Sequence, residues 1–170
     1  MVQDKITLQR IQTLHPKLRA EATAIYQKAV AALTGNATVR FAFTLRTFAE
    51  QNAIYAQGRT KPGKIVTMAR GGSSYHNYGL AIDIVLLVDK DRNGTYEEAS
   101  WDTLKDFDGD KVADWMEVVK IFQSFGWEWG GTFKSIPDPP HFQKTFGFSV
   151  SQLLTKYNSK QLTADGYVKL

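Results

Sequence analysis

The sequence predicts an α+β fold in which helices flank a small, mainly antiparallel sheet. Apolar residues recur at helical spacing across residues 16–33. Large apolar residues alternate with small or polar ones across residues 39–46, and residues 80–88 form a nearly continuous apolar run. Alternation indicates a strand with one buried face, and a short apolar run indicates a strand buried on both faces. These patterns together predict helices packed on a sheet.

The first predicted helix covers residues 16–33 and precedes the first predicted strand. Pro16 suits an early helical position, and Gly35 follows the helix as a stop signal. Alternation gives the strand a core face with four large side chains: Val39, Phe41, Phe43 and Leu45. Arg46 ends this strand on the opposite face.

A capping box opens the second predicted helix. Thr47 and Glu50 have the spacing of this motif, and Gly58 ends a helix that reaches about residue 57. Residues 63–72 are predicted to form a loop around a short extended segment at residues 65–67.

The second half of the chain supplies a buried strand, two helices and two short strands. Asp83 interrupts the apolar strand at residues 80–88. Asp114 and Glu117 form a second capping pair before a helix at residues 115–125, which Gly126 ends. The remaining predicted elements are short strands near residues 127–129 and 141–143 and a last helix near residues 149–157.

Length and composition indicate one compact domain. The 170 residues are 43% hydrophobic and 22% charged, and they contain no internal repeat or linker, so we expect a single domain at residues 1–170 with an acidic insert at about residues 89–114. The absence of cysteine excludes thiol nucleophiles, disulfides, iron–sulfur clusters and thiolate zinc sites. A transition-metal site must therefore use carboxylates and the three histidines, His15, His76 and His141.

No apolar run approaches the ~20 residues of a membrane-spanning helix. The first ten residues also lack the apolar core of a signal peptide. We therefore expect a chain that is synthesised in the cytoplasm without a signal peptide, so that any activity outside the cell needs release or export by another route.

Charge is distributed unevenly along the chain. The net charge is +4, but residues 1–70 carry eleven Lys or Arg against three acids, whereas residues 89–117 carry four against ten. A basic first half suits polyanionic partners such as nucleic acid, a membrane surface or the bacterial cell wall. A solvated basic face without a partner is the simpler alternative. No nucleic-acid partner is expected, because no recognisable DNA- or RNA-binding motif accompanies the basic residues.

The first chemically informative segment places a histidine seven residues before a carboxylate in an apolar strand. Burying Asp83 without partners is costly, so a cation or several hydrogen-bond donors should face it. Gly79 permits a turn that brings His76 toward Asp83, and Ala81 leaves room beside the carboxylate. A hydrogen-bonded His–Asp pair in the core explains the same residues.

The second segment supplies another histidine and another carboxylate. Two prolines precede His141, and Asp138 lies three residues before it. Two histidines and one carboxylate make a catalytic-type zinc site, with an open position for water. Zinc lowers the pKa of that water to about 7, and a nearby carboxylate can accept its proton. Asp138 is the candidate for that role, although a turn-capping role before the prolines explains it equally well.

These segments resemble the LAS-type zinc peptidases, which include VanY-like D-alanyl-D-alanine carboxypeptidases and L-alanyl-D-glutamate endopeptidase endolysins. Residues 74–83 match all five fixed positions of the SxHxxGxAxD signature. The resemblance extends over about residues 14–146 and includes segments 45–51, 55–60, 65–67, 129–131 and 138–142. It implies a zinc site in a groove on the sheet, with ligands His76, Asp83 and His141.

The resemblance also implies the roles of other residues. Asp138 becomes the catalytic acid and base, and Arg46 contacts the substrate or stabilises the oxyanion. Ser74 is interpreted as a hydrogen-bonding residue and not as a nucleophile, because no GxSxG turn surrounds it. The expected substrate-binding set is Arg46, Gln51, Ser74, Tyr78 and Trp129.

The implied function is hydrolysis of a bond in the peptidoglycan stem peptide by a monomeric zinc metallopeptidase. Several carboxypeptidase members have Glu where this chain has Asp138, and this departure favours an L-alanyl-D-glutamate endopeptidase. A D-alanyl-D-alanine carboxypeptidase remains the main alternative. A non-catalytic zinc domain that binds cell wall or a protein partner, and a nucleic-acid-binding domain, are the alternatives from other classes.

The acidic insert contains two partial matches to calcium-binding loops. Asp89, Asp91 and Asn93 begin such a loop, but Ser100 stands where a bidentate Glu belongs. In the second match, Asp106, Asp108, Asp110 and Glu117 occupy ligand positions, but Lys111 replaces the sixth-position glycine. Solvated acidic loops and helix capping by Asp114 and Glu117 are the alternatives to calcium binding.

His15 and the aromatic residues of the predicted helix at 115–125 have simpler interpretations. His15 precedes Pro16 at a helix start, which favours a surface or capping residue over a fourth metal ligand. Trp115, Phe122 and Phe125 lie at roughly helical spacing and are expected in the core.

Overall fold

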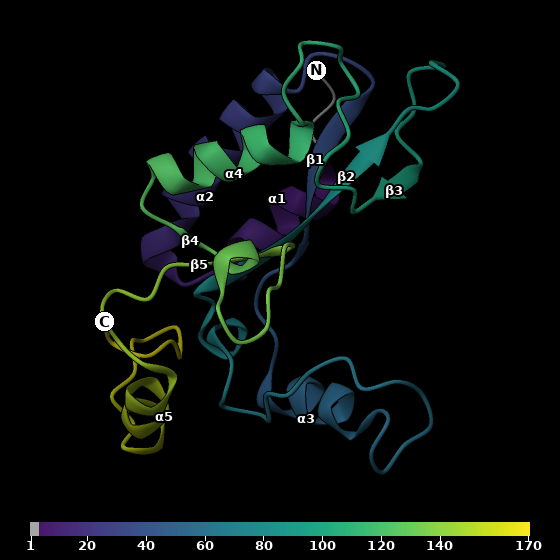
Figure 1. The fold of residues 1–170 in the computed structure, drawn as a ribbon. Helices are drawn as coiled ribbons and strands as arrows, with labels where there is room; N and C mark the ends of the chain where they lie inside the picture. Colours follow the sequence, from purple (N-terminus) through teal and green to yellow (C-terminus); the bar gives the residue numbers. More distant parts are fainter. Residues whose placement is uncertain (1–3) are drawn as a thin grey trace.

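The computed structural model describes residues 4–170 and confirms an α+β fold (Figure 1). Among these residues the helices are α1 (Lys5–Gln12), α2 (Pro16–Ala32), α3 (Phe48–Ala56), η1 (Tyr75–Tyr78), α4 (Asp114–Ser124), η2 (Gly130–Thr132) and α5 (Val150–Asn158), of which η1 and η2 are short 3-10 turns. The strands are β1 (Ala37–Phe43), β2 (Ala81–Val88), β3 (Glu98–Ser100), β4 (Glu128–Trp129) and β5 (His141–Gln143). Of these elements, α1, β3 and the two 3-10 turns were not expected from the sequence.

All five strands form one antiparallel sheet with β2 in the middle. The order is β1-β2-β5-β4, and β3 pairs with the far end of β2. In this register Asp83 of β2 lies opposite His141 of β5 and opposite Phe43 of β1. Residues that are far apart in the sequence therefore meet at the start of β2.

Helices α1, α2 and α4 cover one face of the sheet, and α2 and α4 lie side by side over it (Figure 1). Trp115 and Phe122 of α4 are fully buried, as the helical spacing predicts, and Phe125 packs partly buried against the same core. The ring of Phe122 stacks on Phe142 of β5, with centroids 4.1 Å apart. This contact anchors β5, and therefore His141, to the core.

Strand β1 departs from simple alternation at its end. A bulge between Phe41 and Phe43 shifts the register, because Phe41 pairs with Ile84 and Phe43 pairs with Asp83. The predicted core positions Phe43 and Leu45 are consequently 55% and 36% exposed, and Thr44 turns inward instead. The bulge reverses which side chains face the core just before Arg46.

Helix α3 and the loop after it form a lobe apart from the sheet (Figure 1). The predicted capping box is confirmed, because the side chain of each of Thr47 and Glu50 accepts a hydrogen bond from the backbone of the other. Gly58 follows the helix with a φ of +73°. The segment at residues 65–67 is not a strand.

The start of helix α4 differs from the capping pair expected there. Ala113 is the N-cap residue, and no side chain caps the helix. Asp114 is instead the first helical residue, and its Oδ1 accepts a hydrogen bond from the backbone of Phe107. Across residues 4–170, no helix combines the length and apolar character that crossing a membrane requires.

Candidate functional site

Three side chains that can bind a metal converge at the start of β2. They are His76 from η1, Asp83 from β2 and His141 from β5. His76 Nε2 lies 3.0 Å from Asp83 Oδ1 and 3.2 Å from His141 Nδ1, and His141 Nδ1 lies 3.1 Å from Asp83 Oδ1. The turn that brings His76 here needs Gly79, which has a φ of +67° and no room for a Cβ, since one would lie 2.6 Å from His15 N.

Backbone and side-chain oxygens orient both imidazoles. His76 Nδ1 lies 2.6 Å from the carbonyl oxygen of Thr44, which can only accept, so we assign the proton to Nδ1. His141 Nε2 lies 3.1 Å from Gln143 Oε1, and the amide nitrogen of Gln143 donates to Glu128. In the neutral rings the remaining nitrogens, Nε2 of His76 and Nδ1 of His141, therefore direct lone pairs toward Asp83.

These atoms fit a zinc ion. Zinc bound tetrahedrally at its usual bond lengths separates its ligand atoms by about 3.3 Å, close to the 3.0–3.2 Å between the three atoms here. Burial by itself raises the pKa of Asp83, but the adjacent imidazoles outweigh this effect and hold that pKa well below its usual range. Asp83 can therefore supply an ionised oxygen to a metal, and three protein ligands would leave a fourth position for water.

Arg46 lies beside the cluster and is held by Gln51. Its Nη2 is 3.8 Å from Asp83 Oδ2, and its Nη1 donates to Gln51 Oε1 at 3.0 Å. Gln51 is fully buried, and its amide nitrogen donates to the carbonyl of Ala69 at 2.8 Å. The expectation that Gln51 contacts substrate is therefore wrong, because its polar atoms are used inside the lobe to orient Arg46.

Asp138 lies on the same cavity, in the segment before β5. Its backbone N–H donates to Gly130 and its carbonyl accepts from His141, so the loop is tied on both sides. A Cβ on Gly130 would collide with the carbonyl oxygen of Asp138, which explains the glycine there. Desolvation at the cavity wall and the charge of Asp83 both raise the pKa of Asp138.

Trp129 supports this loop from behind. Its indole N–H donates to the carbonyl of Pro139 at 2.7 Å, and its ring packs over Gly131. It is not among the residues that line the cavity. Trp129 therefore holds the segment that carries Asp138, and the expected substrate contact through it stays a prediction.

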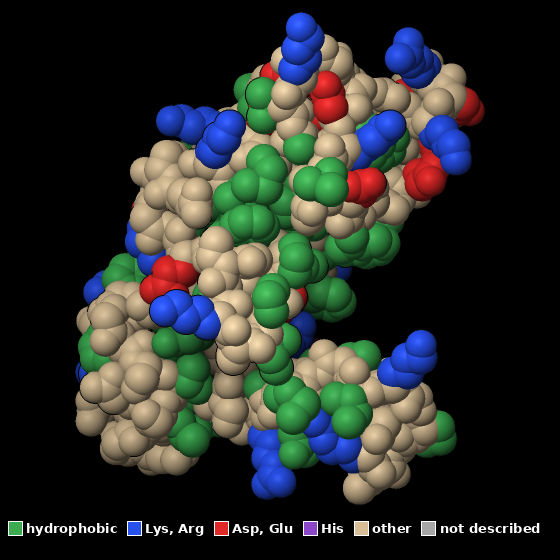
Figure 2. Space-filling model, viewed as in Figure 1, with side chains coloured by type: hydrophobic (Ala, Val, Ile, Leu, Met, Phe, Trp, Pro, Cys, Tyr) green, Lys and Arg blue, Asp and Glu red, His purple; other side chains and the backbone are tan. Residues whose placement is uncertain are grey.

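A groove of about 760 Å³ separates the α3 lobe from the sheet and has the three candidate metal ligands in its wall. Figure 2 shows the surface hollowed between the lobe and the rest of the molecule. The residues of the groove described above are Phe43, Arg46, His76, Asp83, Asp138 and His141, and Ser74 also lines it. Ser74 accepts a hydrogen bond from the backbone of His76, so its hydroxyl both faces the groove and fixes η1.

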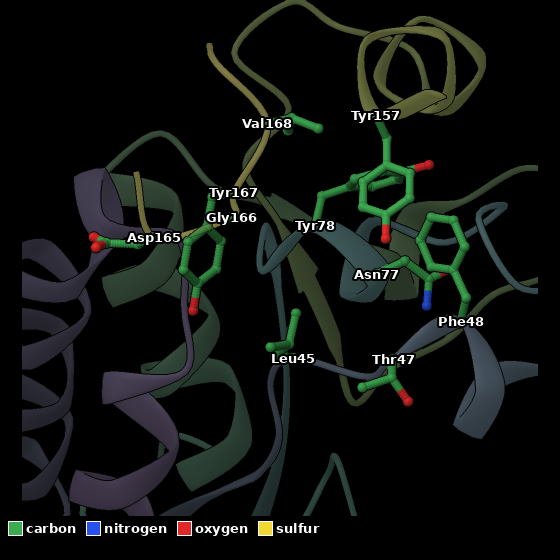
Figure 3. A pocket seen from close by; sticks show the side chains of 10 residues that line it. All are labelled: Leu45, Thr47, Phe48, Asn77, Tyr78, Tyr157, Asp165, Gly166, Tyr167 and Val168. Carbon is green, nitrogen blue, oxygen red and sulfur yellow. The ribbon is translucent and has the colours of Figure 1, made fainter. Parts of the chain in front are cut away.

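Tyr78 lies in a different place from the one expected. Its side chain is 2% exposed, and its hydroxyl donates to the carbonyl of Gly72. It lines a separate cavity of about 310 Å³, together with Phe48 and Tyr157 and beside the C-terminal residues 165–168 (Figure 3). Tyr78 is thus a packing residue and does not contact substrate in the groove.

His15 lies outside the cluster and caps α2, which is one of the two roles predicted for it. Its Nδ1 accepts from the backbone of Lys17, and its Nε2 pairs with the carbonyl of Val168. It is buried and not a surface residue.

The acidic insert contains a second group of possible ligands that the sequence identified only in part. Asp106, Asp108 and Asp114 come together, as do Asp108, Asp110 and Glu117. Burial and the neighbouring carboxylates raise the pKa of Glu117 to about 7. From the sequence, Asp114 was interpreted only as a helix cap. Asp114 occupies position 9 of a twelve-residue calcium loop that begins at Asp106, and this spacing could have identified it as a possible ligand.

The comparisons with known proteins match peptidases of two different specificities. A model of M15 peptidases, described as D-alanyl-D-alanine carboxypeptidase, matches residues 67–144. The peptidoglycan L-alanyl-D-glutamate endopeptidase CwlK of Bacillus subtilis (strain 168) is 45% identical over 130 residues, which are 76% of this chain and 72% of that protein. The crystal structure of the Serratia marcescens L-Ala D-Glu endopeptidase ChiX matches with a TM-score of 0.52 at 23% identity, over 84% of this chain and 88% of that chain, which indicates a shared fold.

Proposed function

Because this chain belongs to the M15 family of peptidases, we propose that it is a zinc-dependent L-alanyl-D-glutamate endopeptidase of peptidoglycan. The observation that carries the proposal is the convergence of two imidazole lone pairs and one carboxylate oxygen in the wall of a groove that also contains Asp138 and Arg46. Three protein ligands and an open fourth position are typical of catalytic zinc.

The roles of the protein groups follow from their positions. His76, Asp83 and His141 would hold the zinc ion, which would supply Lewis acidity for activating water and polarising a carbonyl. Asp138 accepts the proton of the attacking water and delivers it to the departing amine, because its carboxyl lies on the same groove as the three candidate ligands. The guanidinium of Arg46, fixed by Gln51, stabilises negative charge on the carbonyl oxygen.

The lobe that faces the groove suits an anionic substrate. Residues 51–82 contain no Asp or Glu, whereas Arg59, Lys61, Lys64 and Arg70 lie among them. Figure 2 shows Lys and Arg but no acidic side chain on the visible face of this lobe. The stem peptide carries a free carboxylate beside its alanyl-glutamate bond, so a basic lobe next to the groove attracts it.

The choice of scissile bond rests on the relative CwlK, whose name gives this activity at 45% identity. Asp138 in place of Glu also favours the endopeptidase. The description of the matching family model favours the second candidate, a D-alanyl-D-alanine carboxypeptidase. Either activity acts on the bacterial cell wall outside the membrane.

Digestion of purified peptidoglycan, followed by mass spectrometry of the products, tests the proposal. We expect new N-terminal D-glutamate, and His141→Ala should produce none. Free D-alanine without new N-terminal glutamate would identify the carboxypeptidase instead. If the zinc-loaded protein binds the wall but releases neither product, the chain is a non-catalytic zinc domain.

A further inference from the structure

Five carboxylates gather in front of helix α4, at the opposite end of the sheet from the groove (Figure 1). One ligand oxygen from each of Asp106, Asp108 and Asp114 lies within 4.8 Å of the others, and the same holds for Asp108, Asp110 and Glu117. Within residues 4–170, no Lys or Arg nitrogen lies within 4.0 Å of any of the five. The negative charges are therefore not compensated by ion pairs.

Two of these carboxylates bury oxygens that have no partner among residues 4–170. Asp114 is 0% exposed, and while its Oδ1 accepts from the backbone of Phe107, its Oδ2 accepts no hydrogen bond. Glu117 Oε2 is also buried and without a partner. A buried carboxylate oxygen without a donor or cation is strongly disfavoured. One carboxylate oxygen of Asp114 lies within 4.8 Å of ligand oxygens of Asp106 and Asp108, so its buried oxygen without a partner indicates a ligand at the cluster.

The spacing and backbone of this segment suit a twelve-residue calcium loop. Asp106, Asp108, Asp110, Asp114 and Glu117 occupy positions 1, 3, 5, 9 and 12. Lys111 stands at the sixth position, where such loops use glycine, yet it adopts the left-handed conformation that the glycine normally provides, with a φ of +75°. The Lys-for-Gly mismatch in the sequence therefore does not prevent the loop conformation.

We propose that Asp106, Asp108, Asp110, Asp114 and Glu117 bind one calcium ion. A donor set made only of oxygens selects a hard cation over zinc, which prefers sites with nitrogen or sulfur. Calcium accepts six to eight oxygen ligands in flexible geometry, whereas magnesium retains several waters and is seldom enclosed by protein carboxylates alone.

The position of the site gives the ion a structural role. Asp108 Oδ2 accepts from both the backbone and the hydroxyl of Thr34, in the turn between α2 and β1. Asp114 and Glu117 belong to the first turn of α4, whose Trp115 is fully buried. Calcium bound between these residues joins the two core helices at this end of the sheet, and it should raise thermal stability without being required for hydrolysis.

Calorimetric titration of the zinc-loaded protein with calcium chloride tests the proposal. We expect a one-to-one isotherm with a dissociation constant below about 1 mM, the weak limit of calcium modules, and a melting temperature that rises with calcium. Glu117→Gln should weaken binding roughly tenfold or more, because it removes one ligand charge. The matched control is Asp91→Asn in the neighbouring acidic loop, which removes one carboxylate charge from a residue that belongs to neither group of possible ligands; it should leave affinity unchanged.

A flat isotherm at about 5 mM calcium would overturn the proposal. Equal weakening by Glu117→Gln and Asp91→Asn would also overturn it, because binding would then be diffuse. Binding of magnesium as tightly as calcium would overturn the choice of ion. If Glu117→Gln does not fold, terbium luminescence of the wild-type protein decides instead, because Trp115 adjoins Asp114 and can sensitise a bound ion that calcium displaces.

Discussion

The carbonyl oxygen of Thr44 lies 2.6 Å from Nδ1 of His76 and fixes which nitrogen of that ring can bind a metal. The contact depends on the bulge in β1, which turns Thr44 inward where simple alternation would have exposed it. One irregular residue pair in a strand thus sets the orientation of an imidazole 32 residues further along the chain.

Replacement of one ligand should remove the metal. In His141→Ala only His76 and Asp83 remain of the three ligands, so zinc should be lost on dialysis. His15→Ala is the matched control, because His15 is a buried histidine outside the cluster. It should retain one zinc while losing about 1 kcal/mol of stability through its lost helix cap. Elemental analysis of both dialysed variants makes the comparison, and full zinc occupancy in His141→Ala would contradict the assignment.

Asp138→Asn should retain zinc and lose most of its turnover. Asn preserves the size of the side chain but cannot accept the proton from water, and general acid–base catalysis contributes about 10²–10⁴-fold. The exposed Asp102→Asn is the control and should behave as wild type. The measurements are zinc content and the rate of release of stem-peptide fragments. Near-wild-type turnover in Asp138→Asn would show that another group transfers the proton.

The elements that could be predicted from the sequence are those whose signals are local. The capping box of Thr47 and Glu50 lies within four residues, and its helix was predicted with nearly correct bounds. The bulge after Phe41 could not be predicted, because it depends on pairing with β2, some 40 residues away. A prediction from alternation assumes regular strand pairing. The bulge interrupts that pairing, and Phe43 is exposed as a result.

The residues of the site also divide into those that could be predicted from the sequence and those that could not. The motif spacing singled out His76, Asp83 and His141, which the structure brings together. The interpretation of Gln51 and Tyr78 as substrate contacts was wrong, because whether a polar side chain faces a groove or the interior depends on packing between elements. Proximity to a motif in sequence does not provide that information.

An ion pair at the first helix should make stability depend on pH. The guanidinium of Arg40 binds both oxygens of Asp4, at 2.8 and 3.0 Å. Burial raises the pKa of Asp4, but Arg40 and Thr7 outweigh it, so this pKa is lower in the folded state than in the unfolded state. The ion pair therefore contributes to stability above about pH 4, which is the pKa of Asp4 in the unfolded state. The contribution is lost as pH falls through the pKa of Asp4 in the folded state.

Asp4→Asn isolates this charge, because Asn can still cap the helix. We expect the free energy of unfolding to fall by about 1 kcal/mol at pH 7, since solvent partly screens the pair, and to fall by less at about pH 3. Denaturant unfolding at both pH values measures it. Glu98→Gln, which breaks the exposed pair with Lys90, should change little at either pH. An equal loss for Asp4→Asn at both pH values would mean that the charge is not responsible.

The two hydrogen bonds that link Glu128, Gln143 and His141 should control zinc affinity. Gln143 accepts from His141 Nε2 and donates to Glu128, which keeps the proton of His141 away from the nitrogen that faces the cluster. In Gln143→Leu the proton can move to Nδ1 and compete with the metal, so affinity should fall about 10–100-fold. Glu128→Gln should have a smaller effect, because Gln143 can still accept from His141. The exposed Gln123→Leu on α4 is the control. Competition with a chromogenic chelator measures affinity directly, and an unchanged affinity in Gln143→Leu would show that the orientation of His141 is fixed by its place in β5 alone.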